Sequence, residues 1–314
     1  MDQASVNPLL GISLKVVSTL VFAFMGAGVK YLSERYPIGQ IVFCRSFFAM
    51  IPLVIWLWWL GLWPSAIRTT RPFSHIRRGV TGSVGMFLGF AGLSYLPLPD
   101  QTALGYTAPL LVVALAALII GETVRIYRWS AVAIGFVGVV VMLAPQLSAL
   151  SSGVLRDGAT IGAALTLGSA LCNAFSTIEV RKLVQSEEKT GTIVFWVMSM
   201  TTVLGLCTIV LGWRAPGAAD LAIMVGMGVM GGMGQILVTE SYQHAETSLV
   251  APFDYTSMIW AVIIGWFLFG DWPATNIFIG AGIVIAAGIF VIWREHRLGL
   301  ERKRARQASP SKII

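Results

Sequence analysis

Charged side chains are scarce in this sequence. Asp, Glu, Lys and Arg make up 12% of its 314 residues, whereas soluble globular domains carry about 25%. Hydrophobic residues make up 56%, and the mean hydropathy is +0.78. A bilayer core of ~30 Å accepts so much apolar surface, because each helical span needs about 20 apolar residues. The composition excludes a soluble enzyme, a secreted disulfide scaffold and a nucleic-acid binder, and it predicts a polytopic membrane protein.

Cysteine and histidine are also few, with three residues of each. The histidines are scattered over loops and the C-terminal tail. All three cysteines fall inside apolar runs, at Cys44, Cys172 and Cys207. Such cysteines are usually small core residues. We therefore expect no disulfide, no metal site and no cofactor.

The motifs of enzymes and ATPases are missing. The sequence contains no H-E-x-x-H, no G-x-S-x-G and no pair of intramembrane aspartates of the protease type. It also lacks a Walker A motif, which excludes ATP hydrolysis within this chain. We expect a protein that is not an enzyme, and any transport must be driven by a gradient or by exchange.

Apolar runs between polar breaks predict an all-α membrane protein with ten transmembrane helices. Turn residues such as Pro97, Pro145 and Pro216 mark the breaks, none of which could hold a soluble domain. No basic region precedes the first apolar stretch, so we expect no cleaved signal peptide. The predicted spans lie near 9–31, 39–60, 77–96, 101–120, 128–145, 158–181, 191–212, 219–241, 248–269 and 276–293.

The positive charges are distributed asymmetrically. Of the 22 Lys and Arg residues, sixteen fall in the tail and in loops on one side, and four fall in loops on the other side. Because basic loops stay in the cytoplasm, both termini are expected there, in a multi-pass protein of the inner membrane. The net charge of +7 therefore does not indicate nucleic-acid binding. The basic tail, 294–314, is expected to attract anionic lipid and to be disordered toward its end.

The chain repeats itself. Each half holds five spans, so the second half must insert upside down, an arrangement typical of secondary transporters. The predicted repeats are 9–145 (spans one to five) and 158–293 (spans six to ten). At an offset of 149, Gly79, Gly82 and Gly85 map onto Gly228, Gly231 and Gly234, Tyr106-Thr107 onto Tyr255-Thr256, and Gly121-Glu122 onto Gly270-Asp271; at 151, Lys30 maps onto Arg181.

Ionisable residues inside spans are costly unless they are paired or hydrated. Arg45 lies about 9 Å into the second span, and Lys15 and Asp254 lie at similar depth from the opposite side. We predict that Arg45 faces a wet cavity or a partner and binds substrate. At its depth Asp254 could bind a proton, and Lys15 is its natural counter-charge, so both are gating or coupling candidates. Glu240, near a helix end, is a third such candidate.

Uncharged polar residues add further substrate-binding candidates: Tyr106, Tyr255, Gln101, Asn173 and Gln235. The two tyrosines are equivalent through the repeat, so they are expected near the pseudo-two-fold axis.

Prolines and glycines inside the spans can shape helix movement. Pro109 and Pro252 each remove a backbone hydrogen bond, so each could form a bend or a hinge. The glycines of the third and eighth spans recur every three or four residues. They predict close helix packing, and such a face would also allow one helix to slide along another.

The sequence resembles the drug/metabolite transporter superfamily, specifically its ten-helix members with two EamA domains. The stretches that carry the resemblance are 43–48 (FCRSFF), 71–79 (RPFSHIRRG), Gly121-Glu122, 135–139 (GFVGV) and 251–255 (APFDY). The second of these, 71–79, is similar to the loop that enters the third helix in S-adenosylmethionine-uptake-like members. The resemblance extends over 10–295, to proteins like the S-adenosylmethionine-uptake and riboflavin transporters. Asp254 departs from the family pattern, which has no fixed acid there.

The resemblance implies a central cavity between the repeats and alternating access. We predict a secondary transporter of a small polar metabolite of the amino-acid, nucleoside-derivative or flavin class, with H⁺ as a candidate coupling ion. A lipid-linked-sugar flippase and a membrane-embedded enzyme or receptor remain alternatives, and a homodimer is left open.

Overall fold

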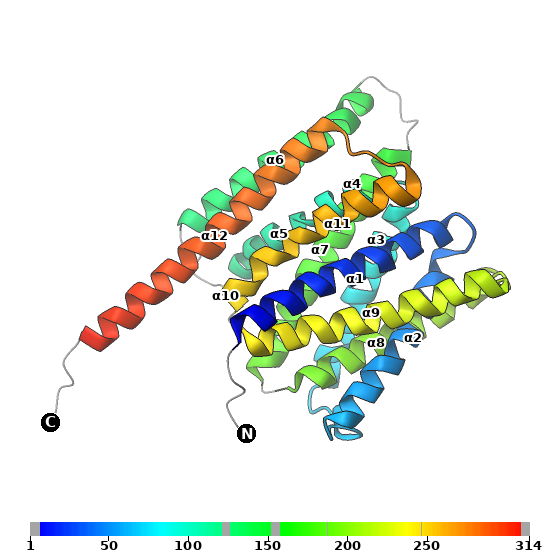
Figure 1. Cartoon of the computed structure of the whole chain (residues 1–314), viewed down its shortest axis with the longest axis horizontal. Helices are drawn as coiled ribbons and strands as arrows, with labels where there is room; N and C mark the ends of the chain where they lie inside the picture. The colour runs from blue at the N-terminus through cyan, green and yellow to red at the C-terminus, as the bar shows by residue number, and fades with distance from the viewer. Residues whose placement is uncertain (1–6, 121–125, 152–157, 187, 246, 309–314) are drawn as a thin grey trace.

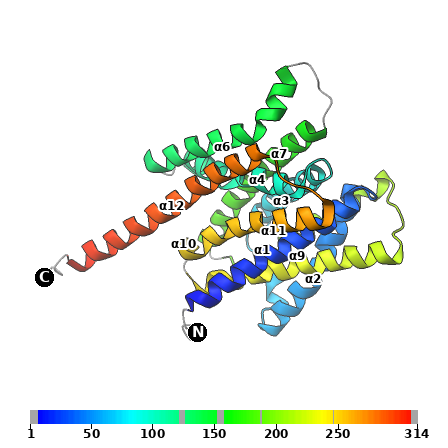
Figure 2. The same cartoon turned by 45° about the horizontal axis from the view of Figure 1, so that its top comes forward.

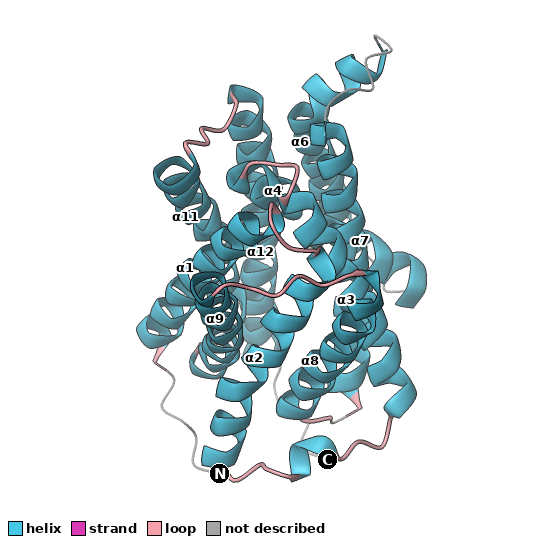
Figure 3. Cartoon of the chain, turned by 90° about the vertical axis from the view of Figure 1, so that its right-hand side faces the viewer, coloured by secondary structure: helices cyan, strands magenta, loops and turns pink. Residues whose placement is uncertain are grey.

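The computed structural model describes residues 7–120, 126–151, 158–186, 188–245 and 247–308. Within these ranges every regular element is a helix and no strand occurs (Figure 3). Among the described residues, seven helices are long and apolar enough to cross a membrane. The ten predicted spans correspond to α1 (Pro8–Ser33), α2 (Ile38–Trp59), α3 (Pro72–Leu93), α4 and α5 (Leu98–Gly105, Thr107–Leu115), α6 (Ile126–Ser151), α7 (Gly158–Gln185), α8 (Thr190–Cys207), α9 (Ala218–His244), α10 and α11 (Thr247–Val250, Thr256–Ile264) and α12 (Thr275–Ala308).

Several helix boundaries differ from the prediction by a few residues, and three of the differences have a structural reason. The third span was placed at 77–96, but α3 begins at Pro72, because proline suits a first helical turn, where its missing N–H is not needed. Pro145 does not break the chain but lies inside α6, as membrane helices tolerate when neighbouring groups satisfy the freed carbonyl. The basic tail continues α12 to Ala308, while its last six residues lie outside the described ranges.

The fourth and ninth spans are interrupted helices. The α-helical hydrogen bonding stops at Tyr106 in one and in the 3₁₀ turn Ala251–Tyr255 in the other. The helices α5 and α11 resume at Thr107 and Thr256, which are 149 residues apart, and each ends in a π-helical turn, again 149 residues apart. The same offset as in the sequence therefore relates both the breaks and the turns of the two repeats.

Helices of the two repeats pack in pairs. α1 lies beside α9, α3 beside α7, and α6 beside α12 (Figures 1 and 2). Both described chain ends lie at the same end of the bundle, beyond which α12 projects (Figure 1). We call this the termini end, and the end that holds the α1–α2 connection the far end. Large apolar side chains cover the outside, such as Trp59 at 79% and Val210 at 84% exposure, as expected for a surface against lipid.

Candidate functional site

Three adjoining cavities run from the middle of the bundle toward the termini end. A central cavity of ≈ 320 Å³ and a second cavity of ≈ 490 Å³ share Thr19, Phe22 and Ser257 as lining residues. The second cavity and a third of ≈ 660 Å³ share Pro109 and Asp254. Because each neighbouring pair shares lining residues, the three cavities lie in a row from the protein interior to the ends of α7 and α9.

Arg45 lies in the wall of the central cavity. Arg45 is 5% exposed. Its Nη1 donates a hydrogen bond to the Met198 sulfur at 3.2 Å, and its Nε has no hydrogen-bond partner among the described residues. No carboxylate of the described residues forms an ion pair with it. A buried charge without a counter-ion is costly, so the arrangement favours an anionic group supplied by a solute.

The glycine face of α3 allows polar side chains of α7 to reach the central cavity. A Cβ at Gly85 would lie 2.9 Å from Oδ1 of Asn173, and one at Gly89 would lie 2.9 Å from Oγ of Ser169. Ser169 donates a hydrogen bond to the Gly85 carbonyl (2.7 Å) and accepts one from Nδ2 of Asn173 (3.3 Å). Asn173 and Gln101 both line the cavity, so amide donors and acceptors face the same space as Arg45.

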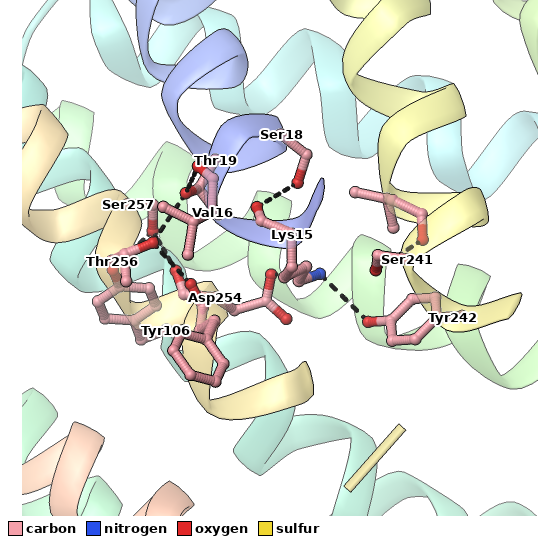
Figure 4. Close-up of polar contacts among 12 residues, drawn as sticks. Lys15, Val16, Ser18, Thr19, Tyr106, Ser241, Tyr242, Asp254, Thr256 and Ser257 are labelled. Atoms are coloured by element: carbon pink, nitrogen blue, oxygen red, sulfur yellow. Dashed lines mark hydrogen bonds and ion pairs between the residues drawn. The ribbon is translucent and has the colours of Figure 1, made fainter. Parts of the chain in front are cut away.

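Lys15 and Asp254 form an ion pair where α1 meets the interrupted ninth span. Lys15 Nζ lies 2.6 Å from Oδ1 of Asp254 and donates a hydrogen bond to the Tyr242 hydroxyl at 3.2 Å (Figure 4). The two partners differ in exposure, since the Lys15 side chain is 3% exposed and that of Asp254 is 50% exposed. Asp254 therefore faces the second and third cavities, while Lys15 anchors it from within the protein.

The break in the ninth span is stabilised by hydroxyl groups. Ser257 donates to the Asp254 carbonyl at 2.6 Å, and Thr256 donates to the Phe253 carbonyl at 2.7 Å. Thr256 also lies 2.8 Å from the hydroxyl of Thr19 on α1. These contacts satisfy carbonyls that a regular helix would pair with its own N–H groups.

The repeat-equivalent tyrosines, which were expected near the pseudo-two-fold axis, are in contact. The rings of Tyr106 and Tyr255 are 5.1 Å apart, edge to face. The Tyr106 hydroxyl lies 2.7 Å from Oγ of Ser257 and donates to the Tyr255 carbonyl at 3.3 Å. Both tyrosines line the second cavity, next to Pro109. The two interrupted spans thus contact each other at their breaks.

Other predicted residues lie apart from these cavities. Gln235 and Glu240 are not among the residues lining the three cavities. Glu240 instead lies near the His244 ring one helical turn away, at 3.9 Å. Pro252 is in the 3₁₀ turn that carries Asp254.

Comparison with known proteins identifies the family. One family model matches the chain twice, over residues 9–144 and 160–294, with the description "EamA-like transporter family". The chain belongs to the EamA-like transporter family. Two similar regions in one chain agree with the two repeats of the fold, and membership identifies a transmembrane transporter of the drug/metabolite transporter superfamily.

Similar proteins include transporters of different solutes. A riboflavin transporter of Rhizobium johnstonii is 29% identical over 95% of both chains. An S-adenosylmethionine uptake transporter of Rickettsia prowazekii is 26% identical over 95% of this chain and 97% of its own length. A crystal structure with 15% identity aligns with a TM-score of 0.62 over 90% of this chain and 96% of that chain, which supports the fold alone. These similarities identify this EamA-like transporter as a metabolite transporter.

Several residues of the site were missed in the sequence. Thr19, Ser169, Tyr242 and Ser257 are small or common polar residues of membrane helices, and no spacing distinguished them. Their positions become informative only when the interrupted spans bring their hydroxyl groups together. One signal in the sequence could have been used. The repeat offset of 149 marks Tyr255 and Thr256, and Ser257 is the next residue.

Proposed function

We propose that this EamA-like transporter carries a small polar metabolite with an acidic group through the central cavity by alternating access. The observation that supports this function is the buried, unpaired guanidinium of Arg45 in the cavity wall. A guanidinium is always charged and presents donors in a fixed, planar arrangement that fits a carboxylate or phosphate. The solute would thus supply the missing counter-charge.

The other cavity residues support a solute with hydrogen-bonding groups. Gln101 and Asn173 offer amide donors and acceptors, and Phe22 and Phe90 offer apolar contact. Amino acids, nucleoside derivatives such as S-adenosylmethionine, and flavins meet these requirements to different degrees. The names of the two relatives support the last two classes.

The route of cavities supports a state that is accessible from the termini end. In the proposed orientation this end faces the cytoplasm and the protein lies in the inner membrane. A reporter fused after Ser311 should then be active only in the cytoplasm, and a cysteine introduced at Ser151 should be labelled from outside intact cells. A C-terminus outside the cell would contradict this orientation.

Asp254 and Lys15 are proposed as the coupling pair. Asp254 is exposed to the route while Lys15 is buried, so a proton arriving through the cavities reaches the carboxylate first. Protonation of Asp254 would remove its attraction to Lys15 and loosen α1 from the ninth span. Proton binding would in this way alter the contact between two helices of different repeats.

The function is tested by an uptake screen with the purified protein in proteoliposomes. Amino acids, S-adenosylmethionine, nucleosides and riboflavin are offered with and without a pH gradient. We expect uptake of a solute that carries a carboxylate or phosphate, and the signal should be lost in Arg45→Ala. Uptake of an uncharged solute that persists in Arg45→Ala would contradict the proposed role of the cavity.

A further inference from the structure

A second ion pair joins the two repeats at the far end. Lys30, near the end of α1, forms a salt bridge with Asp271, which follows the π-helical turn of the ninth span. Its Nζ also lies 3.4 Å from the Leu96 carbonyl, between α3 and α4, and 5.0 Å from the ring centre of Phe269. One ammonium group therefore connects three segments that come from both repeats.

The same place borders the central cavity. Leu93 and Leu98 line the cavity where α3 gives way to α4, and they are 4% and 3% exposed. Leu96, whose carbonyl faces Lys30, is likewise buried. Toward the termini end, by contrast, the cavity continues into two further cavities. The ion pair thus lies beside the buried leucines that line the central cavity on the side away from the other two cavities.

We propose that Lys30 and Asp271 form the far-end gate of the transport cycle. This inference rests on the proposed transport function. It names the residues that stabilise the state in which the far end is closed. Opening the cavity to the far end requires the α3–α4 connection, α1 and the end of the ninth span to separate. Lys30 belongs to α1 and contacts the other two segments. Breaking the pair is therefore coupled to exposing the cavity.

The exposure of the pair suits a reversible contact. The Lys30 and Asp271 side chains are 13% and 24% exposed, so neither is sealed from water. A fully buried pair would leave costly unpaired charges on opening, whereas a fully exposed pair contributes little. An intermediate pair stabilises the closed state and still allows both groups to be hydrated when the gate opens.

The test measures access to the cavity and needs no substrate. In a background with the three native cysteines replaced, Thr102→Cys places a thiol in the cavity wall, since Thr102 lines it. A membrane-impermeant maleimide is applied from the far end, identified as the side opposite a C-terminal tag. We expect slow labelling with the pair intact and labelling at least tenfold faster in Asp271→Asn and in Lys30→Gln.

The charge swap separates a gate from general damage. Lys30→Asp combined with Asp271→Lys should restore slow labelling, because the attraction is restored in reverse. A matched control is Asp220→Asn, which removes another ion pair at the far end, between Arg35 and Asp220 at 3.6 Å, away from the cavity lining. This control should leave labelling slow.

Three results would overturn the gate. These are unchanged labelling in a correctly inserted Asp271→Asn variant, equal acceleration in Asp220→Asn, or a swap that labels as fast as the single variants. Because labelling does not involve transport, the outcome is independent of Arg45. A gate could be confirmed even if the uptake screen contradicted the proposed substrate class, and the reverse also holds.

Discussion

The two repeats share a backbone plan but not their charges. Continuing the offset of the first and sixth spans, Lys15 corresponds to Thr166, and Asp254 corresponds to Gly105. Thr166 is buried and donates a hydrogen bond only within its own helix, to the Gly162 carbonyl at 2.8 Å. The termini-end ion pair therefore exists on one side of the pseudo-symmetry. The two repeats share the backbone arrangement around the cavities, whereas the charged residues Lys15 and Asp254 have no charged equivalents in the other repeat.

The two glycine faces show the same difference. Gly85 and Gly89 of α3 pack against Asn173 and Ser169 of α7. On α9, Gly234 lies next to the Phe22 ring, while Gly231 lies next to the Arg45 side chain, whose Nε would be 3.0 Å from an added Cβ. The repeat-equivalent Gly85 and Gly234 thus face an amide and an aromatic ring, so glycines of the two faces should respond differently to substitution.

The largest expected effect is at Arg45, the charge without a partner. Arg45→Ala should reduce uptake by about 100-fold or more, because losing one member of a buried charge pair costs roughly 2–5 kcal/mol. Insertion and monodispersity should be retained, since among the described residues the only polar contact of Arg45 is with Met198. Uptake kinetics in proteoliposomes measure the effect.

Arg45→Lys sharpens that result. Lysine keeps the charge but not the planar donor arrangement, so a large loss would indicate directional recognition and full activity a point charge. Wild-type kinetics in Arg45→Ala would show that the solute binds elsewhere.

The next effect concerns the ion pair that breaks the symmetry. Asp254→Asn should flatten the pH dependence of transport and lower its rate more than its substrate affinity, because the variant cannot exchange a proton. Rates measured between pH 5.5 and 8.5 in proteoliposomes test this.

A permanent structural pair predicts a different pattern. In that case Asp254→Asn and Lys15→Met would both express poorly, and exchanging the two charges would partly rescue expression. An Asp254→Asn variant with normal expression and an unchanged pH profile would exclude the coupling role.

A smaller effect separates the two glycine faces. Gly85→Ala would press its Cβ on the Asn173 amide, 2.9 Å away, and should raise KM several-fold with little change in thermal stability. Gly232→Ala, on α9, would meet the Ala49 carbonyl at 2.5 Å and Pro52 at 2.6 Å. Because overpacking against backbone costs about 1–3 kcal/mol, this variant should lose Tm instead. If Gly85→Ala and Gly232→Ala changed KM equally, the two glycine faces would not differ in function.

The sequence predicted the ten spans from apolar runs between polar breaks, and it predicted the repeat from matching residues at a nearly constant offset. It also predicted that Lys15 and Asp254 could meet, because two opposite charges at similar depth in lipid favour contact. It missed the Lys30–Asp271 pair, because both residues fall at the ends of predicted spans, where a charge can be hydrated without a partner. The sequence predicted that Pro252 could form a bend, but it missed the contacts that hold the break. Only the three-dimensional arrangement shows that the carbonyls there accept hydrogen bonds from Thr256 and Ser257 of α11 and from Tyr106 at the end of α4.

The smallest expected effect is at a contact between the repeats outside the spans. Glu188, between α7 and α8, accepts hydrogen bonds from the Thr69 hydroxyl (2.7 Å) and the Thr70 N–H (3.2 Å), between α2 and α3. Burial alone would raise the pKa of Glu188, but these hydrogen bonds and the nearby His75 outweigh it and hold the pKa below its ordinary 4.5.

A lowered pKa makes this contact stabilising when the carboxylate is ionised. Its contribution is fully present above pH 4.5 and is lost as the pH falls through the lower value of the folded protein. Glu188→Gln should therefore lower Tm by roughly 2–4 °C at pH 7, for a loss of about 1 kcal/mol, and the difference from wild type should shrink below pH 4.5. Glu34→Gln, at an exposed carboxylate of the far end, is the control and should leave Tm unchanged. A difference between Glu188→Gln and wild type that grows on acidification would mean that the ionised carboxylate does not hold the two loops together.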